Sequence, residues 1–127
     1  MDHLFVYGSL LSNIGHENGR RLAAEADLIG PASVTGRLYR VSWYPALAAP
    51  ILADDVVHGE LYRLRDPAKS LQWLDEYEDI GRSDEYERIL VEASVLPPRS
   101  DLPASISAWV YRYRRPTEGL PHIETGR

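Results

Sequence analysis

The chain contains no cysteine among its 127 residues, which excludes disulfide bonds, thiolate catalysis and cysteine-ligated zinc within it. It also has few histidines, and none of them forms the i, i+4 pair of a helical metal site. The four are His3, His16, His58 and His122. We therefore expect neither a metal site nor a metal cofactor.

Clustered positive charge and long apolar runs are scarce as well. The net charge is -5, the isoelectric point is near 5.3, and the basic residues cluster only at Arg112, Arg114 and Arg115. No apolar run approaches the roughly 20 residues of a transmembrane helix, and the first residues lack the pattern of a signal peptide. We therefore expect a cytoplasmic protein with no nucleic-acid or membrane partner.

The length and composition that remain are typical of a globular protein. With 44% hydrophobic and 26% charged residues, 127 residues are enough to bury a core. We expect a single domain over residues 1–127. The sequence does not indicate an oligomeric state.

The order of patterns along the chain predicts an α+β fold. Residues 42–55 are apolar without a clear period, and the tail after residue 115 has an irregular pattern. We expect strands over 4–7, 34–41, 56–64, 85–96 and 106–113, a helix over 16–27 closed by Gly30-Pro31, and a helix from Asp66 to about Asp79 that stops at Gly81. Such a sheet could curl into a small barrel.

The first strand ends in a turn that is suited to binding an anion. Leu4 to Tyr7 is an apolar and aromatic run, and Gly8-Ser9 ends it abruptly. A glycine after such a strand lets the backbone turn sharply, and the following N–H groups can then enclose a negative charge. An ordinary Gly-Ser turn is the alternative that these residues leave open.

The second helix places carboxylates on its apolar face. Four residues fall within an arc of about 100°: Leu71, Leu74, Asp75 and Glu78. Mutual repulsion and partial burial should raise the pKa of Asp75 or Glu78, which would supply a proton-transfer group near neutral pH. Alternatively, one or both turn outward or pair with Arg82 or Arg88.

Several segments, in the right order, resemble the γ-glutamylcyclotransferase-like family. Tyr7-Gly8-Ser9-Leu10 resembles its signature loop, and Trp43-Tyr44-Pro45 its pocket-lining Tyr-Pro segment. The strand around Val57-His58-Gly59-Glu60-Leu61-Tyr62 resembles the motif Val-x-Gly-Glu-Leu/Val-Tyr. Leu74-Asp75-x-x-Glu78 resembles the Leu-Asp-x-x-Glu motif, although Asp79 follows where the family usually has glycine. Tyr86-Glu87-Arg88 resembles its Tyr-x-Arg segment.

The resemblance implies a small mixed β-barrel with flanking helices and a cofactor-independent enzyme. Its reaction is the intramolecular aminolysis of a γ-glutamyl substrate to 5-oxoproline and a free amine. Glu78 would be the catalytic acid/base, and the backbone of Gly8, Ser9 and Leu10 would hold the substrate carboxylate or the oxyanion. Tyr7 would line the same site, and Tyr111 matches the ligand-contacting tyrosine of the family's Tyr-x-Tyr strand.

Two questions stay open at this level. A non-catalytic member could use the same pocket to bind a small metabolite, or its surface could recognise a protein. The leaving group is also open: glutathione, γ-glutamyl amino acids, γ-glutamylamines and γ-glutamyl-protected intermediates share the γ-glutamyl half.

Ser9 lacks the partners of a serine nucleophile, because no Gly-x-Ser-x-Gly elbow or Ser/His/Asp order accompanies it.

Overall fold

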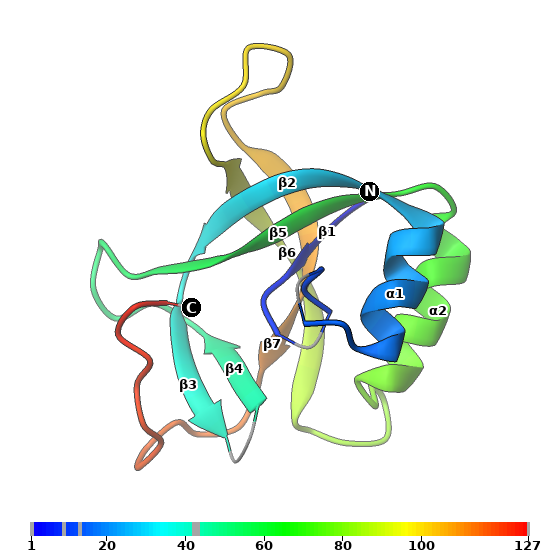
Figure 1. Ribbon diagram of the computed structural model, residues 1–127. Helices are drawn as coiled ribbons and strands as arrows, with labels where there is room; N and C mark the ends of the chain where they lie inside the picture. Colours follow the sequence, from blue (N-terminus) through cyan, green and yellow to red (C-terminus); the bar gives the residue numbers. More distant parts are fainter. Residues whose placement is uncertain (1, 9, 13, 42–43, 127) are drawn as a thin grey trace.

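The structure is a computed structural model, and it describes residues 2–8, 10–12, 14–41 and 44–126. Its elements are β1 (His3–Val6), α1 (Glu17–Glu25), β2 (Ala26–Thr35), β3 (Arg37–Val41), β4 (Tyr44–Ala48), β5 (Val56–Leu64), α2 (Pro67–Tyr77), β6 (Tyr86–Val95) and β7 (Ile106–Tyr113). A closed barrel has the strand order β1-β5-β2-β6-β7, and β3 and β4 form a separate hairpin. The barrel is mixed because β1 pairs with β7 in parallel. The expected α+β barrel with helices on its flank is thus confirmed (Figure 1).

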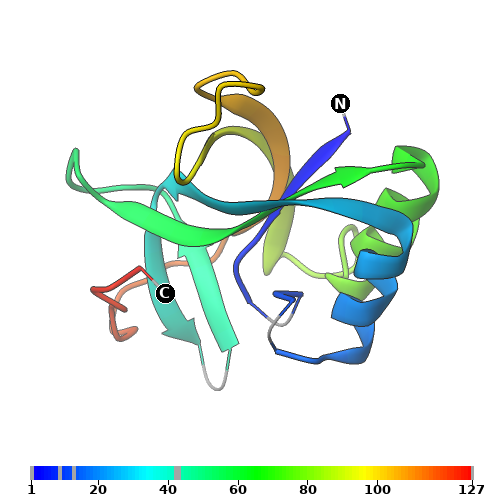
Figure 2. The same ribbon diagram turned by 45° about the horizontal axis from the view of Figure 1, so that its top comes forward.

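Two apolar clusters hold these layers together. Successive side chains of a strand point to opposite faces, so β1 serves both clusters. Leu4 and Val6 pack in the cluster that contains Leu22 of α1 and Leu74 of α2. Phe5 packs in the other cluster, which includes residues of the β3–β4 hairpin and the barrel strands. The helices lie beside each other on one flank of the barrel, as both ribbon views show (Figures 1 and 2).

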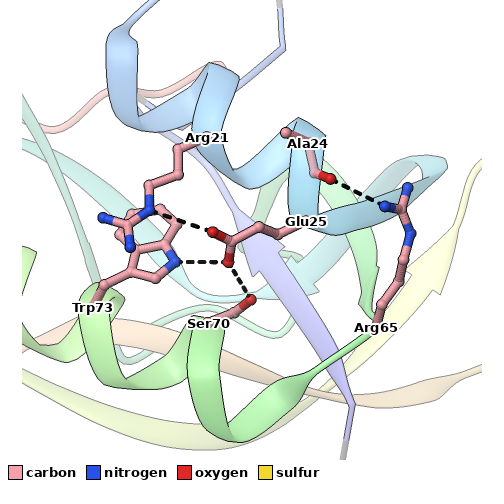
Figure 3. A network of polar contacts seen from close by, with 6 residues as sticks. All are labelled: Arg21, Ala24, Glu25, Arg65, Ser70 and Trp73. Atoms are coloured by element: carbon pink, nitrogen blue, oxygen red, sulfur yellow. Dashed lines mark hydrogen bonds and ion pairs between the residues drawn. The ribbon is translucent and has the colours of Figure 1, made fainter.

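Glu25, the last residue of α1, fastens the two helices to each other (Figure 3). Its Oε1 accepts hydrogen bonds from Ser70 Oγ at 2.8 Å and Trp73 Nε1 at 2.9 Å, both on α2. Arg21 donates to Oε2 at 3.3 Å and places its guanidinium 4.3 Å from the centre of the Trp73 ring. Partial burial acts to raise the pKa of Glu25, but the hydrogen bonds from Trp73, Ser70 and Arg21 leave it below its ordinary value. The carboxylate is therefore held ionised between the helices.

The prediction that the first helix continues to residue 27 and closes at Gly30-Pro31 is wrong. The helix ends at Glu25, and residues 26–35 form β2, which pairs along its whole length with β5. Gly30 and Pro31 lie inside this strand, at a bulge where the register shifts between Leu28 and Gly30. Pairing with a distant strand has overridden the local signal, as is common for β structure.

The predicted strand over 34–41 is also wrong as a single element. The chain leaves the barrel at Gly36, whose N–H donates to the backbone oxygen of Asp55 at 3.1 Å. A Cβ atom at Gly36 would lie 3.0 Å from the backbone oxygen of Ala48, so this close approach favours glycine. Beyond Gly36 the chain forms β3, and the apolar stretch without a clear period contains its partner β4.

The remaining elements agree with the sequence. The strands predicted over 56–64 and 106–113 are β5 and β7, and the strand over 85–96 is β6. The second helix begins at Pro67, where Asp66 accepts the N–H of Lys69 as its cap. Among the described residues, no helix is both long and apolar enough to cross a membrane.

Candidate active site

A cavity of about 270 Å³ lies where the end of β1 meets the end of α2. It brings together Tyr7, Gly8, Leu10, Glu78 and Tyr111, while Ser9 lies outside the described residues. The remaining residues of its wall are Phe5, Val6, Tyr44, Pro45, Tyr77, Glu85 and Tyr86. Tyr44 and Pro45 belong to the segment that sequence analysis singled out, of which Trp43 is not described.

The loop after β1 is anchored by the glutamate of the Val-x-Gly-Glu motif. Glu60 accepts the backbone N–H of Ser12 at 2.7 Å and the Ser12 hydroxyl at 2.6 Å. Within the loop, the N–H of Leu11 donates to the backbone oxygen of Gly8 at 3.0 Å. No acceptor within the described part of the chain takes the N–H of Gly8 or of Leu10. Two backbone donors on the wall of the cavity thus remain available to an anion.

Tyr7 uses its hydroxyl group to join three strands. The hydroxyl donates to the backbone oxygen of Tyr111 at 2.5 Å and accepts the N–H of Leu47 at 3.4 Å. Burial, and then the negative charge of Glu78, raise the pKa of Tyr7 far above its usual value, so the phenol stays neutral. Its hydroxyl proton is already used, and Tyr7 therefore lines the cavity without offering it a hydrogen-bond donor.

Glu78 caps the C-terminus of α2. Its N–H donates to the backbone oxygen of Leu74 at 2.9 Å, and the chain then turns through Asp79, which has a φ of 58°. This left-handed conformation is the one that a glycine at a helix end usually supplies. Asp79, a residue type that tolerates it, thus takes the role of the glycine that usually follows the motif. The helix itself ends at Tyr77, two residues before the predicted end near Asp79.

The Glu78 carboxylate is half-buried and has no hydrogen-bond or ion-pair partner among the described residues. Burial, and then the negative charge of Glu85, raise its pKa from 4.5 to about 7. A carboxyl group with such a pKa can both accept and return a proton near neutral pH. The arrangement supplies an acid/base group within a small cavity.

Repulsion between Asp75 and Glu78, which the helical spacing suggested, is not the cause of this shift. Asp75 is bound elsewhere: Arg88 donates to its Oδ1 at 2.9 Å and to its Oδ2 at 3.3 Å. The Tyr111 hydroxyl donates to the same Oδ1 at 2.7 Å. The alternative of an ion pair with Arg88 is therefore correct for Asp75, while Glu85 is the carboxylate that acts on Glu78.

A wider hollow of about 620 Å³ borders Asp75 and Arg88 and does not include Glu78. The Arg88 guanidinium lies there, 4.3 Å from the centre of the Trp109 ring. Asp75 thus stands between the two hollows, with Tyr111 on the side of the smaller one. We place the candidate active site in the smaller cavity because it holds the carboxyl group with the raised pKa.

Sequence analysis missed Glu85 and Tyr86 as parts of the site. Glu85 accepts a hydrogen bond from the Tyr44 hydroxyl, and this bond, followed by burial, raises the pKa of Tyr44 to about 12. Tyr86 is buried, and its hydroxyl has no partner among the described residues. Burial above all, with the neighbouring Tyr7 and Glu78, raises the pKa of Tyr86, so it remains a neutral donor. The sequence placed Tyr86 only in the segment that resembles Tyr-x-Arg, and the closed barrel shows which cavity it reaches.

Comparison with known proteins agrees with this fold. A family model described as gamma-glutamyl cyclotransferase, AIG2-like, matches residues 4–127. Over 124 residues the chain is 36% identical to the gamma-glutamylcyclotransferase family protein YtfP of Escherichia coli (strain K12), and the match covers 97% of this chain and 92% of that protein. The chain belongs to the AIG2-like gamma-glutamyl cyclotransferase family.

Solved structures share the same fold. An AIG2-like protein of Mus musculus has a TM-score of 0.74 at 26% identity, over 98% of this chain and 86% of that one. YkqA of Bacillus subtilis has a TM-score of 0.71 at 21% identity, and the match covers 98% of this chain. The chain spans only 38% of YkqA, so this second likeness shows the fold alone.

Proposed function

We propose that the protein is a γ-glutamylcyclotransferase-type enzyme that converts a γ-glutamyl amine or peptide to 5-oxoproline and a free amine. The observation that carries the proposal is the state of Glu78. Its carboxylate lines a 270 Å³ cavity, is unpaired among the described residues, and has a pKa of about 7. A site that only bound a metabolite would have little use for a carboxyl group poised to titrate there.

In the proposed reaction the α-amino group of the substrate attacks its own γ-carbonyl carbon. The new C–N bond closes a five-membered lactam, and the C–N bond to the leaving amine breaks. Because the nucleophile is tethered to the electrophile, the substrate supplies much of the proximity. The protein must fold the substrate into the cyclising conformer, stabilise negative charge and move protons.

Glu78 would move the protons. It takes a proton from the attacking nitrogen and delivers one to the leaving nitrogen, which then departs as a neutral amine or an ammonium ion. General acid–base catalysis of this kind is typically worth about 10²- to 10⁴-fold. Since Glu78 has no competing cation among the described residues, its lone pairs remain free for the substrate.

The other polar groups of the cavity would hold charge. The backbone N–H groups of Gly8 and Leu10 are free to bind the substrate α-carboxylate or the oxyanion of the tetrahedral intermediate. The Tyr86 hydroxyl offers a neutral donor in the same space. Tyr111 of β7, oriented by its hydrogen bond to Asp75, would also contact the substrate.

The test is release of 5-oxoproline by the purified protein from a panel of γ-glutamyl compounds with different leaving groups. Glu78→Gln should fold normally and lose activity by about two orders of magnitude or more. Glu76→Gln, an exposed change on the same helix, is the matched control and should keep full activity. Equal turnover by Glu78→Gln and the wild type would overturn the mechanism. If the wild type released no 5-oxoproline from any compound of the panel, a binding role would be favoured.

A further inference from the structure

The charged side chains on the described part of the cavity wall are all carboxylates. Among the described residues of the wall, these are Glu78 and Glu85 alone, and none is a lysine, arginine or histidine. The two arginines after β7 are engaged outside it. Arg115 lies 2.8 Å from Asp84, and Arg114 lies 3.8 Å from Glu87. The charge of Glu85 helps to raise the pKa of Arg115, so this arginine is near Glu85 even though its ion pair is with Asp84. On the described part of the cavity wall itself, a ligand meets carboxylates and no cationic side chain.

Glu85 is held in place and still has a free acceptor. Its N–H donates to Ser83 Oγ at 3.1 Å, and its backbone oxygen accepts the N–H of Arg114 at 2.8 Å. The Tyr44 hydroxyl binds Oε2 of its carboxylate. Among the described residues, no donor takes Oε1. One oriented carboxylate oxygen of Glu85 is thus left for a donor from outside the protein.

The proposed reaction places the leaving group near this oxygen. Glu78 must reach the leaving nitrogen to return a proton, and Glu85 lines the same small cavity as Glu78. In either of its proposed roles, binding the α-carboxylate or the oxyanion, the Gly8 loop would hold the γ-glutamyl half of the substrate on another part of the wall. A group a few bonds beyond the leaving nitrogen would therefore face Glu85 and Tyr44.

We infer that Glu85 is a specificity-determining residue that selects γ-glutamyl conjugates whose leaving amine carries a second positive charge, such as those of short diamines. The inference rests on the proposed function and narrows its substrate class. An ammonium group at this place would bind a charged acceptor, and hydrogen bonds to charged groups are the stronger ones. A leaving group with a carboxylate would instead be repelled by Glu85.

The test is equilibrium binding, measured by titration calorimetry with the Glu78→Gln protein so that turnover does not interfere. The probes are the γ-glutamyl conjugates of diaminopropane and diaminobutane, their propylamine and butylamine counterparts, and the conjugate of aminobutyrate. We expect the better diamine conjugate to bind about tenfold more tightly than its alkylamine counterpart. The aminobutyrate conjugate should bind most weakly.

Adding Glu85→Gln should remove the preference, and it keeps an oxygen that can accept the Tyr44 hydroxyl. Glu118→Gln removes one negative charge from an exposed position, so it is the control and should retain the preference. Equal binding of diamine and alkylamine conjugates, a preference that survives Glu85→Gln, or no binding at all would overturn the inference. Release of 5-oxoproline by the wild type is measured separately. Selective binding without release would contradict the proposed reaction alone. Release without selective binding would contradict only the role of Glu85.

Discussion

The hydroxyl group of Tyr111 donates a hydrogen bond of 2.7 Å to Oδ1 of Asp75, the atom that also accepts the Nε–H of Arg88 at 2.9 Å. Asp75 therefore joins a tyrosine of the candidate active site to an arginine that borders the wider hollow. The motif that resembles Leu-Asp-x-x-Glu thus supplies two carboxylates with different tasks. Asp75 orients a neighbour, while Glu78 is left to titrate.

Asp75→Ala should lower both stability and activity without moving the pH profile. Arg88 would lose its partner while half-buried, which we expect to cost about 2 kcal/mol or more in the free energy of unfolding. Tyr111 would lose its orientation, and kcat/KM should fall about tenfold. Because burial and Glu85 set the pKa of Glu78, the midpoint of the pH profile should stay in place. A midpoint that moves would show that Asp75 acts on Glu78 directly; Tyr111→Phe, which keeps the ion pair, separates the two losses.

The pH dependence of kcat/KM should report Glu78. If Glu78 must be ionised to accept a proton, kcat/KM should rise with pH through a midpoint near 7, the pKa of this group. Glu85→Gln removes the neighbouring negative charge, so the pKa of Glu78 should fall and the midpoint should move to lower pH. Glu118→Gln, which is exposed, should leave the midpoint unchanged. A wild-type midpoint near the ordinary value of 4.5 would contradict the assignment of Glu78 as the base.

Gly59→Ala should be strongly destabilising. A Cβ atom at this position would lie 2.1 Å from the backbone oxygen of Val6 and 2.8 Å from Cζ of Phe5, so β1 and β5 would have to move apart. We expect a loss of about 3 kcal/mol in the free energy of unfolding, measured by urea denaturation. Gly8→Ala is the comparison, because its Cβ would meet its nearest neighbour at 3.4 Å. Equal stability of both variants would disprove the steric account.

The glycine in the Val-x-Gly-Glu motif illustrates what the sequence could predict. The pattern of residues 56–64 indicated a strand with a glycine in its middle. The structure confirms the strand and adds the reason for the glycine, which is the close approach of Val6. Helix α2 could also be predicted from the sequence, because Asp66 and Pro67 mark its start and its apolar residues recur at helical spacing. Sequence patterns of this kind are local, and tertiary contacts do not override them in this fold.

Features that depend on pairing between strands distant in the sequence could not be predicted from the sequence. Residues 26–35 form a strand because β5 and β6 border them on either side, although alanines precede them in a helical pattern. Glu85 and Tyr86 reach the cavity because β6 pairs with β7 and the barrel closes. Nothing in the spacing of residues 75, 78 and 85 shows which carboxylate lies beside Glu78 in space.

Glu25→Ala should loosen the two helices. It would leave the hydroxyl of the fully buried Ser70 and the indole N–H of Trp73 without their acceptor. We expect a loss of about 2 kcal/mol at pH 7, measured by urea denaturation, with Glu118→Ala as the exposed control. Since folding lowers the pKa of Glu25, the part due to its charge is complete above about pH 4.5 and is lost as the pH falls through the lower folded value. A loss that stays constant down to pH 3 would show that packing, not the charge, is what Glu25 contributes.

Glu78→Gln should stabilise the protein while lowering its activity by about two orders of magnitude or more. Folding raises the pKa of Glu78 from 4.5 to about 7, so between these values the folded chain keeps a proton that the unfolded chain releases. Stability from this group is therefore complete below pH 4.5 and is lost as the pH rises through 7. At pH 8 we expect the variant to be more stable than the wild type by about 1–2 kcal/mol, and near pH 4.5 the difference should vanish. Urea denaturation across this range measures it, with Glu76→Gln as the control on the same helix. A variant that is less stable than the wild type at pH 8 would show that the carboxylate is satisfied in the folded protein, and the case for Glu78 as a free acid/base would fail with it.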